Sequence, residues 1–178
     1  AHQSGAHSIL SIGGVQAIGA MAYGLFTGQK ADILVGPGNK FVAEAKRALF
    51  GQCAIDIIAG PTELLILADK KADCELISVD LVSQAEHGFD SPVWLVTNDK
   101  ELGEKVIQRV PELINELPSD NAARVSWNDY GEVILCSSVE EMVKICDEYS
   151  PEHVEVFCDN IDWWHSNLKN CGSLFLGE

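Results

Sequence analysis

Short apolar runs alternate along the chain with longer amphipathic stretches. The runs are rich in Ile, Leu and Val and have the length of strands, whereas the stretches repeat their apolar residues with the period of a helix. We expect strands at residues 8–12, 32–36, 63–68, 92–97, 132–136, 154–158 and 173–177. We expect helices at residues 15–26, 39–50, 74–87, 99–116, 139–149 and 160–170. This alternation is typical of an α/β fold whose parallel sheets are flanked by helices.

Two Gly-Pro loops interrupt this pattern. The GPGN turn at residues 36–39 follows a predicted strand and precedes a helix, and a second turn contains Gly60-Pro61. The charge changes near the second turn: residues 1–70 carry five basic and five acidic side chains, and residues 71–178 carry seven and twenty-two. We therefore predict a boundary between parts of two domains near Gly60-Pro61. The expected domains are residues 1–60 and residues 61–178.

Composition and charge narrow the possible functions. Hydrophobic residues make up 47% of the chain, but the apolar runs are too short for a transmembrane helix. The formal net charge of −15 leaves no basic stripe that could neutralise the phosphates of a nucleic acid. Six cysteines without regular spacing favour a reducing compartment, and the first ten residues lack the basic start of a signal peptide. We expect a cytoplasmic protein that binds neither nucleic acid nor membrane.

The helix predicted over residues 74–87 ends in polar residues on its buried side. Asp73 is a suitable N-cap, Gln84 continues the apolar stripe of Leu81, and His87 lies nearly one turn further on the same side. The Gln84 oxygen and a His87 nitrogen could reach one metal ion, although Gln is an uncommon ligand and two ligands do not close a zinc site. Spacing alone favours another role, in which the two side chains cap the last carbonyls of the helix.

Two other junctions place polar residues where chemistry could occur. The turn at residues 36–39 enters a helix whose first backbone N–H groups could receive an anionic cofactor, although most such turns are only turns. Glu152 and His153 lie together at the entrance of a strand, where a carboxylate and an imidazole can act as an acid/base pair. Pro151 disfavours a helical Ser150 and so fixes the approach to that strand. Taken alone, such a pair is more often two polar residues of a surface loop.

In their order and spacing, six motifs closely resemble those of the histidinol dehydrogenase family. They are GGVQAIGAMAYG, GPGNKFVAEAKR, IDIIAGPTE, DLVSQAEHG, SPEH and GSLFLGE, and they span the chain from about residue 1 to residue 178. The resemblance implies two incomplete Rossmann-like domains in a zinc-dependent, NAD-using homodimer. It also implies the oxidation of L-histidinol to L-histidine through the aldehyde, a reaction of histidine biosynthesis.

The resemblance assigns roles to residues of the second domain. Gln84 and His87 match the two zinc ligands of the QAEH motif, which also approach the substrate. Glu152 and His153 match the acid/base residues of the PEH motif, and His153 is also expected to contact the substrate. Asp80 shares a helix face with Gln84 and His87, and we expect it to support that face or the zinc ligands.

The resemblance also places the cofactor in the first domain. Gln16 and Asn39 match the glutamine of GGxQAI and the asparagine of GPGN, which contact NAD in the family. Two further zinc ligands, an Asp and a His of the partner subunit, would lie beyond residue 178. We therefore expect an internal fragment with half of a metal site, which is inactive by itself.

One departure from the family pattern concerns the substrate. The family's substrate-contacting serine in GPSE is Thr62 here. GPTE, together with SWNDYGEV at residues 126–133, more closely resembles the paralogous sulfopropanediol dehydrogenases, which oxidise a sulfonated diol. Histidinol, a sulfonated diol and another small alcohol therefore stay open as substrates. A non-catalytic metabolite-binding fragment and an acid/base isomerase are the alternatives of another class.

Overall fold

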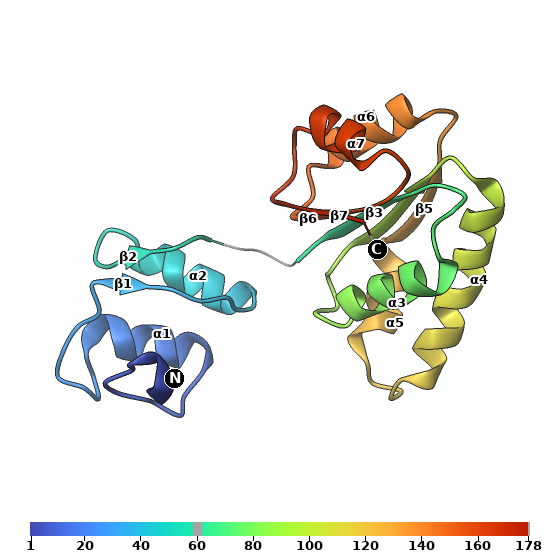
Figure 1. Cartoon of the computed structure of the whole chain (residues 1–178). Helices are drawn as coiled ribbons and strands as arrows, with labels where there is room; N and C mark the ends of the chain where they lie inside the picture. Colours follow the sequence, from blue (N-terminus) through green and yellow to red (C-terminus); the bar gives the residue numbers. More distant parts are fainter. Residues whose placement is uncertain (59–61, 178) are drawn as a thin grey trace. The chain divides into compact units, whose positions relative to one another are not determined.

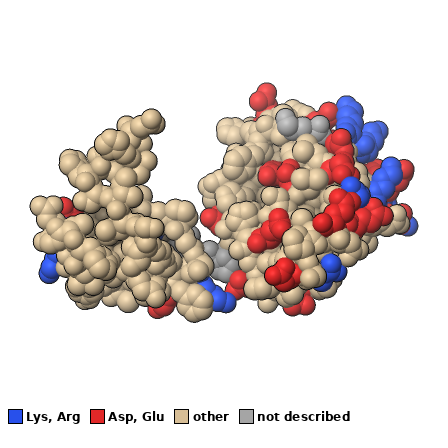
Figure 2. Space-filling model, turned by 90° about the horizontal axis from the view of Figure 1, so that it is seen from below, with Lys and Arg blue, Asp and Glu red and all other residues tan. Residues whose placement is uncertain are grey.

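The chain forms two compact units, Ala1–Pro61 and Thr62–Glu178 (Figure 1). In this computed structural model, residues 1–58 and 62–177 are described. The boundary predicted at Gly60-Pro61 lies outside the described residues. The charge divides with the units: residues 1–61 carry four basic and three acidic side chains, and residues 62–178 carry eight and twenty-four. Figure 2 shows the abundant acidic side chains on one face of the second unit.

The first unit is a small α/β layer with two short parallel strands. Its elements are the 3₁₀ helix η1 (His2–Ser4), α1 (Gly14–Tyr23), β1 (Ile33–Leu34), α2 (Lys40–Leu49) and β2 (Ala54–Ile55). A small core contains Ile18, Ala22, Leu34, Val42, Leu49 and Cys53. The strand predicted at residues 8–12 is wrong. This segment has no regular structure, and Ile9 is 63% exposed, because no described strand pairs with its backbone.

The second unit is built on a five-stranded parallel sheet with the order β5-β4-β3-β6-β7. The strands are β3 (Leu64–Ala68), β4 (Val93–Thr97), β5 (Gly131–Leu135), β6 (His153–Phe157) and β7 (Ser173–Leu176). The helices are α3 (Cys74–Ala85), α4 (Lys100–Glu116), α5 (Ala122–Tyr130), α6 (Val139–Tyr149) and α7 (Ile161–Asn167). The chain starts in the middle of the sheet, moves to one edge and then returns to build the other, as in doubly wound Rossmann-like sheets. The predicted α/β class with parallel sheets is confirmed.

Helices cover both faces of this sheet (Figure 1). One core joins α3, α4 and α5 to alternate strand residues such as Leu64 and Ile66, and the other joins α6 and α7 to residues such as Leu65 and Val154. All five residues of β3 are buried, which explains its uninterrupted apolar run. None of the described helices is both long enough and apolar enough to cross a membrane.

The helix that carries the predicted metal ligands forms as expected. Asp73 caps α3 by accepting the N–H of Glu75, and Ile77 and Leu81 are fully buried. The helix ends at Ala85, two residues before the predicted end. By contrast, α5 was not expected, because its short segment has only a weak apolar period. It begins after Asn121, whose side chain accepts the N–H of Arg124.

Candidate active site

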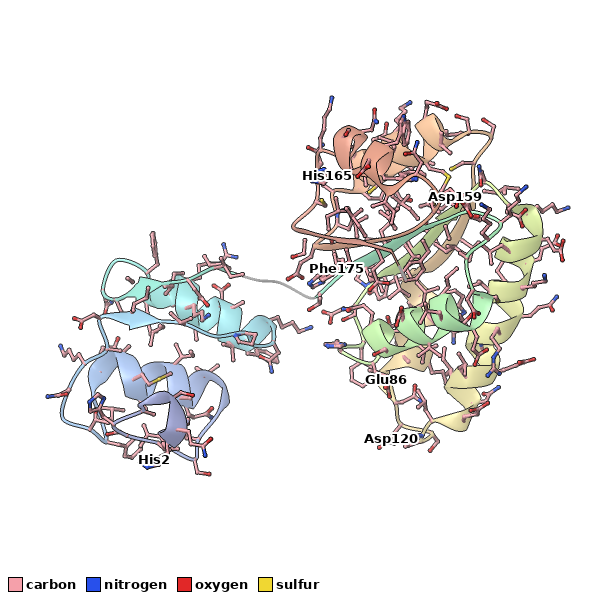
Figure 3. The ribbon with its side chains drawn as sticks, viewed as in Figure 1. His2, Glu86, Asp120, Asp159, His165 and Phe175 are labelled. Carbon is pink, nitrogen blue, oxygen red and sulfur yellow. The ribbon has the colours of Figure 1, made fainter. Side chains whose placement is uncertain are left out.

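Several of the predicted site residues come together at the amino edge of the second sheet, where its strands begin. β3 and β6 are parallel neighbours, with Leu64 in register with His153. Helix α3 runs back from the carboxyl end of β3 toward the start of β4, so its last turn, with Gln84, returns to the amino edge. Thr62, partly buried, directly precedes β3 at this edge. In Figure 3, Glu86 after α3 and the ring of Phe175 both lie toward this side of the unit.

The backbone of the PEH segment is held from two sides. On one side, the His153 N–H donates to the Glu63 carbonyl at 3.1 Å. On the other, the Glu152 carbonyl accepts the N–H of Ser173 at 2.7 Å. A Cβ on Gly172 would lie 2.6 Å from the same carbonyl oxygen, so this position leaves no room for a side chain. The neighbouring strands thus fix where the predicted acid/base pair begins.

Glu152 and His153 differ in backbone conformation, and this difference allows both side chains to reach the same substrate. β6 begins at His153, one residue earlier than predicted, while Glu152 lies in a bend before the strand. Ser150 has left-handed backbone angles, with φ 50° and ψ 51°. It thus leaves the right-handed helical region, as predicted, but does not adopt the extended conformation that is usual before a proline. Because the bend interrupts the strict alternation of a strand, Glu152 and His153 are not forced to opposite faces.

Glu63 is a further acidic residue at this edge that sequence reasoning missed. Burial raises its pKa above the ordinary value, a backbone hydrogen bond from Glu152 lowers it, and the charge of Glu152 raises it. The net effect is a raised pKa, so Glu63 holds its proton more tightly than an exposed glutamate. The available signal was the position of GPTE at a strand entrance, but only the strand order shows that this entrance faces SPEH.

The His153 ring lies half-buried on the α3 side of the sheet. Its Nδ1 is buried and has no hydrogen-bond partner among the described residues. The ring packs against Phe175 of β7, with centroids 5.9 Å apart and planes tilted by 37°. The Phe175 ring packs against the imidazole but makes no hydrogen bond to its nitrogens.

The end of α3 offers one nitrogen and one amide to a metal ion. The exposed His87 has its Nδ1 3.1 Å from the Ser83 carbonyl, and since a carbonyl only accepts, Nδ1 carries the proton. This bond is the capping role that spacing favoured, and it leaves the Nε2 lone pair available as a ligand. The Gln84 Nε2 is buried without a partner among the described residues. A metal ion would take the Gln84 Oε1, because an amide nitrogen has no free lone pair. A histidine nitrogen and an amide oxygen fit zinc but do not close a site, because the described residues contain no cluster of three or more His, Cys, Asp or Glu suited to a metal.

A second acidic pair lies on the same face of the sheet. Burial raises the pKa of Asp80 on α3. Burial, followed by the charge of Asp80, raises the pKa of Glu155 on β6 to about 7. The Glu155 Oε2 is buried without a partner among the described residues. Sequence reasoning missed Glu155, although a charged residue inside an apolar strand such as VEVF was an available signal.

The two predicted NAD contacts lie in the first unit, in the first turns of its helices. Gln16 is exposed in α1. Asn39 is exposed and caps α2, with its Oδ1 accepting the N–H groups of Phe41 and Val42 at 3.1 and 3.2 Å. These two amides are therefore already used and are not open to a phosphate, so the backbone part of the predicted anion site is smaller than expected.

An ion pair supports the turn before Asn39. Lys46 is buried and donates to the Asp56 carboxylate at 2.5 Å and to the Gly36 carbonyl. The other Asp56 oxygen accepts the Gly36 N–H at 2.8 Å. The hydrogen bond from Lys46 and those from the backbone hold the pKa of Asp56 well below its ordinary value. Asp56 in IDIIAGPTE and Lys46 in GPGNKFVAEAKR thus join two of the sequence motifs.

Comparison with known proteins decides the family. The family model described as histidinol dehydrogenase matches residues 1–178. The chain belongs to the histidinol dehydrogenase family. A histidinol dehydrogenase homolog from Pelagibacter ubique is 61% identical over 98% of the chain. The sulfopropanediol 3-dehydrogenase of Ruegeria pomeroyi is 59% identical over 100% of the chain. The crystal structure of histidinol dehydrogenase from Elizabethkingia anophelis superposes with a TM-score of 0.90 at 36% identity, covering 99% of the chain.

The family name denotes an oxidoreductase. The chain spans about 41% of the length of each of these three relatives. The high identity to both a histidinol dehydrogenase homolog and a sulfopropanediol dehydrogenase supports the two motif resemblances seen in the sequence.

Proposed function

We propose that the full-length protein containing this chain is a zinc- and NAD-dependent dehydrogenase that oxidises a small alcohol through the aldehyde to the acid. L-Histidinol is the first candidate substrate, and L-histidine is the corresponding product. The observation that carries the proposal is the meeting of the PEH segment and the end of α3 at one edge of the sheet, within a histidinol dehydrogenase fold. Glu152, His153, Gln84 and His87 would supply the chemistry of that edge.

Gln84 and His87 would hold the zinc ion, together with ligands from outside this chain and from a second subunit of a homodimer. The Nε2 lone pair of His87 supports this assignment, because the hydrogen bond from Nδ1 to Ser83 selects the ligating tautomer. When bound, zinc polarises the alcohol oxygen and eases loss of its proton. The isolated chain should therefore bind zinc weakly, and the full-length protein tightly. Tight stoichiometric zinc in the isolated chain would contradict this ligand set.

His153 would act as the base in the first oxidation. Its Nε2 would take the hydroxyl proton, and NAD, when bound, would be the acceptor for the hydride from the carbon that carries the hydroxyl. The aldehyde then needs a water molecule to attack its carbonyl carbon, and Glu152 would take a proton from that water. A second NAD, when bound, would be the acceptor for the hydride that the resulting hydrate loses as it becomes the acid. Thr62, Gln84 and His87 would complete the substrate contacts. The backbone hydrogen bonds to the Glu63 carbonyl before β3 and from Ser173 of β7 support these roles because they fix the backbone of the pair.

Gln16 and Asn39 would contact NAD through their exposed amide groups. Because Asn39 also caps α2, Asn39→Ala would remove the helix cap and the NAD contact together, and its effect could not be assigned to either. Asn39→Asp keeps a capping oxygen but removes the amide donor and adds a negative charge. We expect Asn39→Asp to raise the KM for NAD much more than the KM for the alcohol. An equal effect on both would assign Asn39 a folding role only.

A sulfonated diol is the second candidate substrate, favoured by the 59% identity to the sulfopropanediol 3-dehydrogenase and by Thr62. The test is steady-state oxidation by the full-length, zinc-loaded protein of histidinol, dihydroxypropanesulfonate and a small diol, with the NADH formed per product measured. Two NADH for each carboxylate formed from histidinol is the expected result. Activity on the sulfonate alone would select the second candidate. Activity on none of the alcohols would overturn the proposed function.

A further inference from the structure

Glu155 lies beside His153 on the same face of β6. The two residues are separated by one position in the strand, so both side chains point toward α3, with Cα atoms roughly 7 Å apart. On the neighbouring strands, Ile66 of β3 and Phe175 of β7 are in register with Glu155. Glu155 therefore has apolar neighbours on both adjacent strands, and its polar neighbour along β6 on the same face is His153.

Each of these side chains carries a buried atom without a partner among the described residues. These atoms are the Nδ1 of His153 and the Oε2 of Glu155. A buried polar atom that makes no hydrogen bond is costly and uncommon. The two atoms are also complementary: Nδ1 is a donor whenever Nε2 carries the lone pair, and a carboxylate oxygen is an acceptor.

We propose that Glu155 positions His153: its Oε2 accepts a hydrogen bond from the Nδ1–H through one bridging water, since the two atoms make no direct hydrogen bond in the structure. This inference rests on the proposed function, in which the Nε2 of His153 takes the substrate proton. The hydrogen bond selects the tautomer with the lone pair on Nε2 and fixes the plane of the ring. After proton transfer both ring nitrogens carry protons, and the Glu155 carboxylate offsets the new positive charge.

The charges around Glu155 agree with this role. Asp80 on α3 is the described acidic group whose charge raises the pKa of Glu155, while Ile66 and Phe175 are uncharged. A carboxylate that is buried beside another acid lacks a cationic or donor partner. The imidazolium of His153, two residues away on the same face, is such a partner and forms during the reaction itself.

The direct test is the tautomer of His153, measured by ¹⁵N NMR of the histidine-labelled chain. The wild type is expected to show the Nδ1–H tautomer, and Glu155→Gln should keep it because the amide oxygen still accepts. Glu155→Leu should yield a mixture with the Nε2–H tautomer. If Glu155→Leu does not fold, Glu155→Val replaces it, since Val is favoured in strands. Glu132→Gln, on β5, is the matched control and should leave the tautomer unchanged.

Kinetics of the full-length protein add a second readout. Glu155→Leu should lower kcat for alcohol oxidation roughly 10- to 100-fold, with the KM for NAD unchanged and substantial rescue in Glu155→Gln. An unchanged His153 tautomer in the Leu or Val variant would overturn the inference, whatever the activity. Because the tautomer is read without substrate, an inactive full-length protein that still shows the tautomer change would overturn the proposed function but not the positioning role.

Discussion

The two edges of the second sheet differ in how their polar groups are satisfied. Doubly wound sheets commonly bind ligands at the carboxyl edge, where the strand order reverses, and here β3 and β6 meet at that point. A hollow of about 290 Å³ lies there, between Asp69, Lys71 and Asp159 among others. Its polar groups pair with one another: Lys71 contacts Asp159 at 2.5 Å, and Asp69 accepts the N–H groups of Lys71 and Asp159 at 2.8 Å each.

The buried polar atoms that have no partner lie away from this hollow, toward the amino edge and on the face of the sheet that α3 covers. Those of the described residues are on Gln84, His153 and Glu155, all on the α3 side of the sheet. Unsatisfied buried atoms are costly to folding, so their concentration indicates a place where function outweighs stability. In this sheet, unmet hydrogen-bonding capacity therefore marks the candidate site better than the presence of a hollow.

The largest effect should come from the acid/base pair. We expect Glu152→Gln and His153→Asn to lower kcat of the full-length protein about 10²–10⁴-fold, because each removes a proton-transfer group while keeping a similar shape. Glu152→Gln should be the more damaging variant when free aldehyde is the substrate. Lys71→Met at the carboxyl edge is the control and should stay within twofold of wild type. Equal losses at the two edges would refute the difference between them.

Gly172→Ala tests whether the PEH segment depends on its close contact with β7. A Cβ would press on the Glu152 carbonyl at 2.6 Å, and relief of such crowding typically costs about 1–3 kcal/mol. All four tryptophans lie in the second unit, so tryptophan fluorescence in urea reports its unfolding. Gly19→Ala, whose Cβ meets nothing within 4 Å, should leave this signal unchanged. A stable Gly172→Ala variant with wild-type kcat would show that the segment does not need this contact.

The pH dependence of stability should reveal Glu155. Its folded pKa of about 7 lies above the unfolded value of 4.5, so between these values the folded state holds a proton that the unfolded state has lost. Stability therefore falls as pH rises through this window. Glu155→Gln should be nearly neutral at pH 4.5 and raise the free energy of unfolding by about 1–2 kcal/mol at pH 8, allowing for partial solvent screening. If Glu155→Gln changed the free energy of unfolding by the same amount at both pH values, Glu155 would not ionise in this range.

The smallest effect is expected from the carboxyl edge. Lys71→Met removes an exposed ion pair with Asp159, and exposed pairs contribute little to stability. The urea midpoint of the second unit should stay unchanged within error. A marked loss of stability would mean that this edge, too, depends on specific polar contacts.

Much of the fold was readable from local patterns. The apolar run at residues 63–68 predicts a strand buried on both faces, which forms at Leu64–Ala68. The stripe through Leu81 predicts the buried side of α3, and this is also confirmed. The strand expected at residues 8–12 failed because a strand also needs a neighbour, which a local pattern does not contain. Helix α5 was missed because its nine residues show too little periodicity.

The candidate site was readable only in part. Gln84 and His87 could be predicted because they are polar residues at the end of an apolar stripe. Glu152 and His153 could be predicted because they form an acid/base pair at a strand entrance. Glu63 and Glu155 were missed because their significance depends on which strands are neighbours. That order follows from the packing of the whole unit and not from any short segment. The roles of the site residues and their zinc and NAD partners stay predictions.

The crystal structure of the full-length, zinc-loaded protein with its alcohol substrate would test the central claim most directly. We expect the alcohol at the amino edge, with its hydroxyl within hydrogen-bonding distance of the His153 Nε2 and zinc on Gln84 and His87. An alcohol bound in the hollow between Asp69, Lys71 and Asp159, with His153 away from it, would contradict the account.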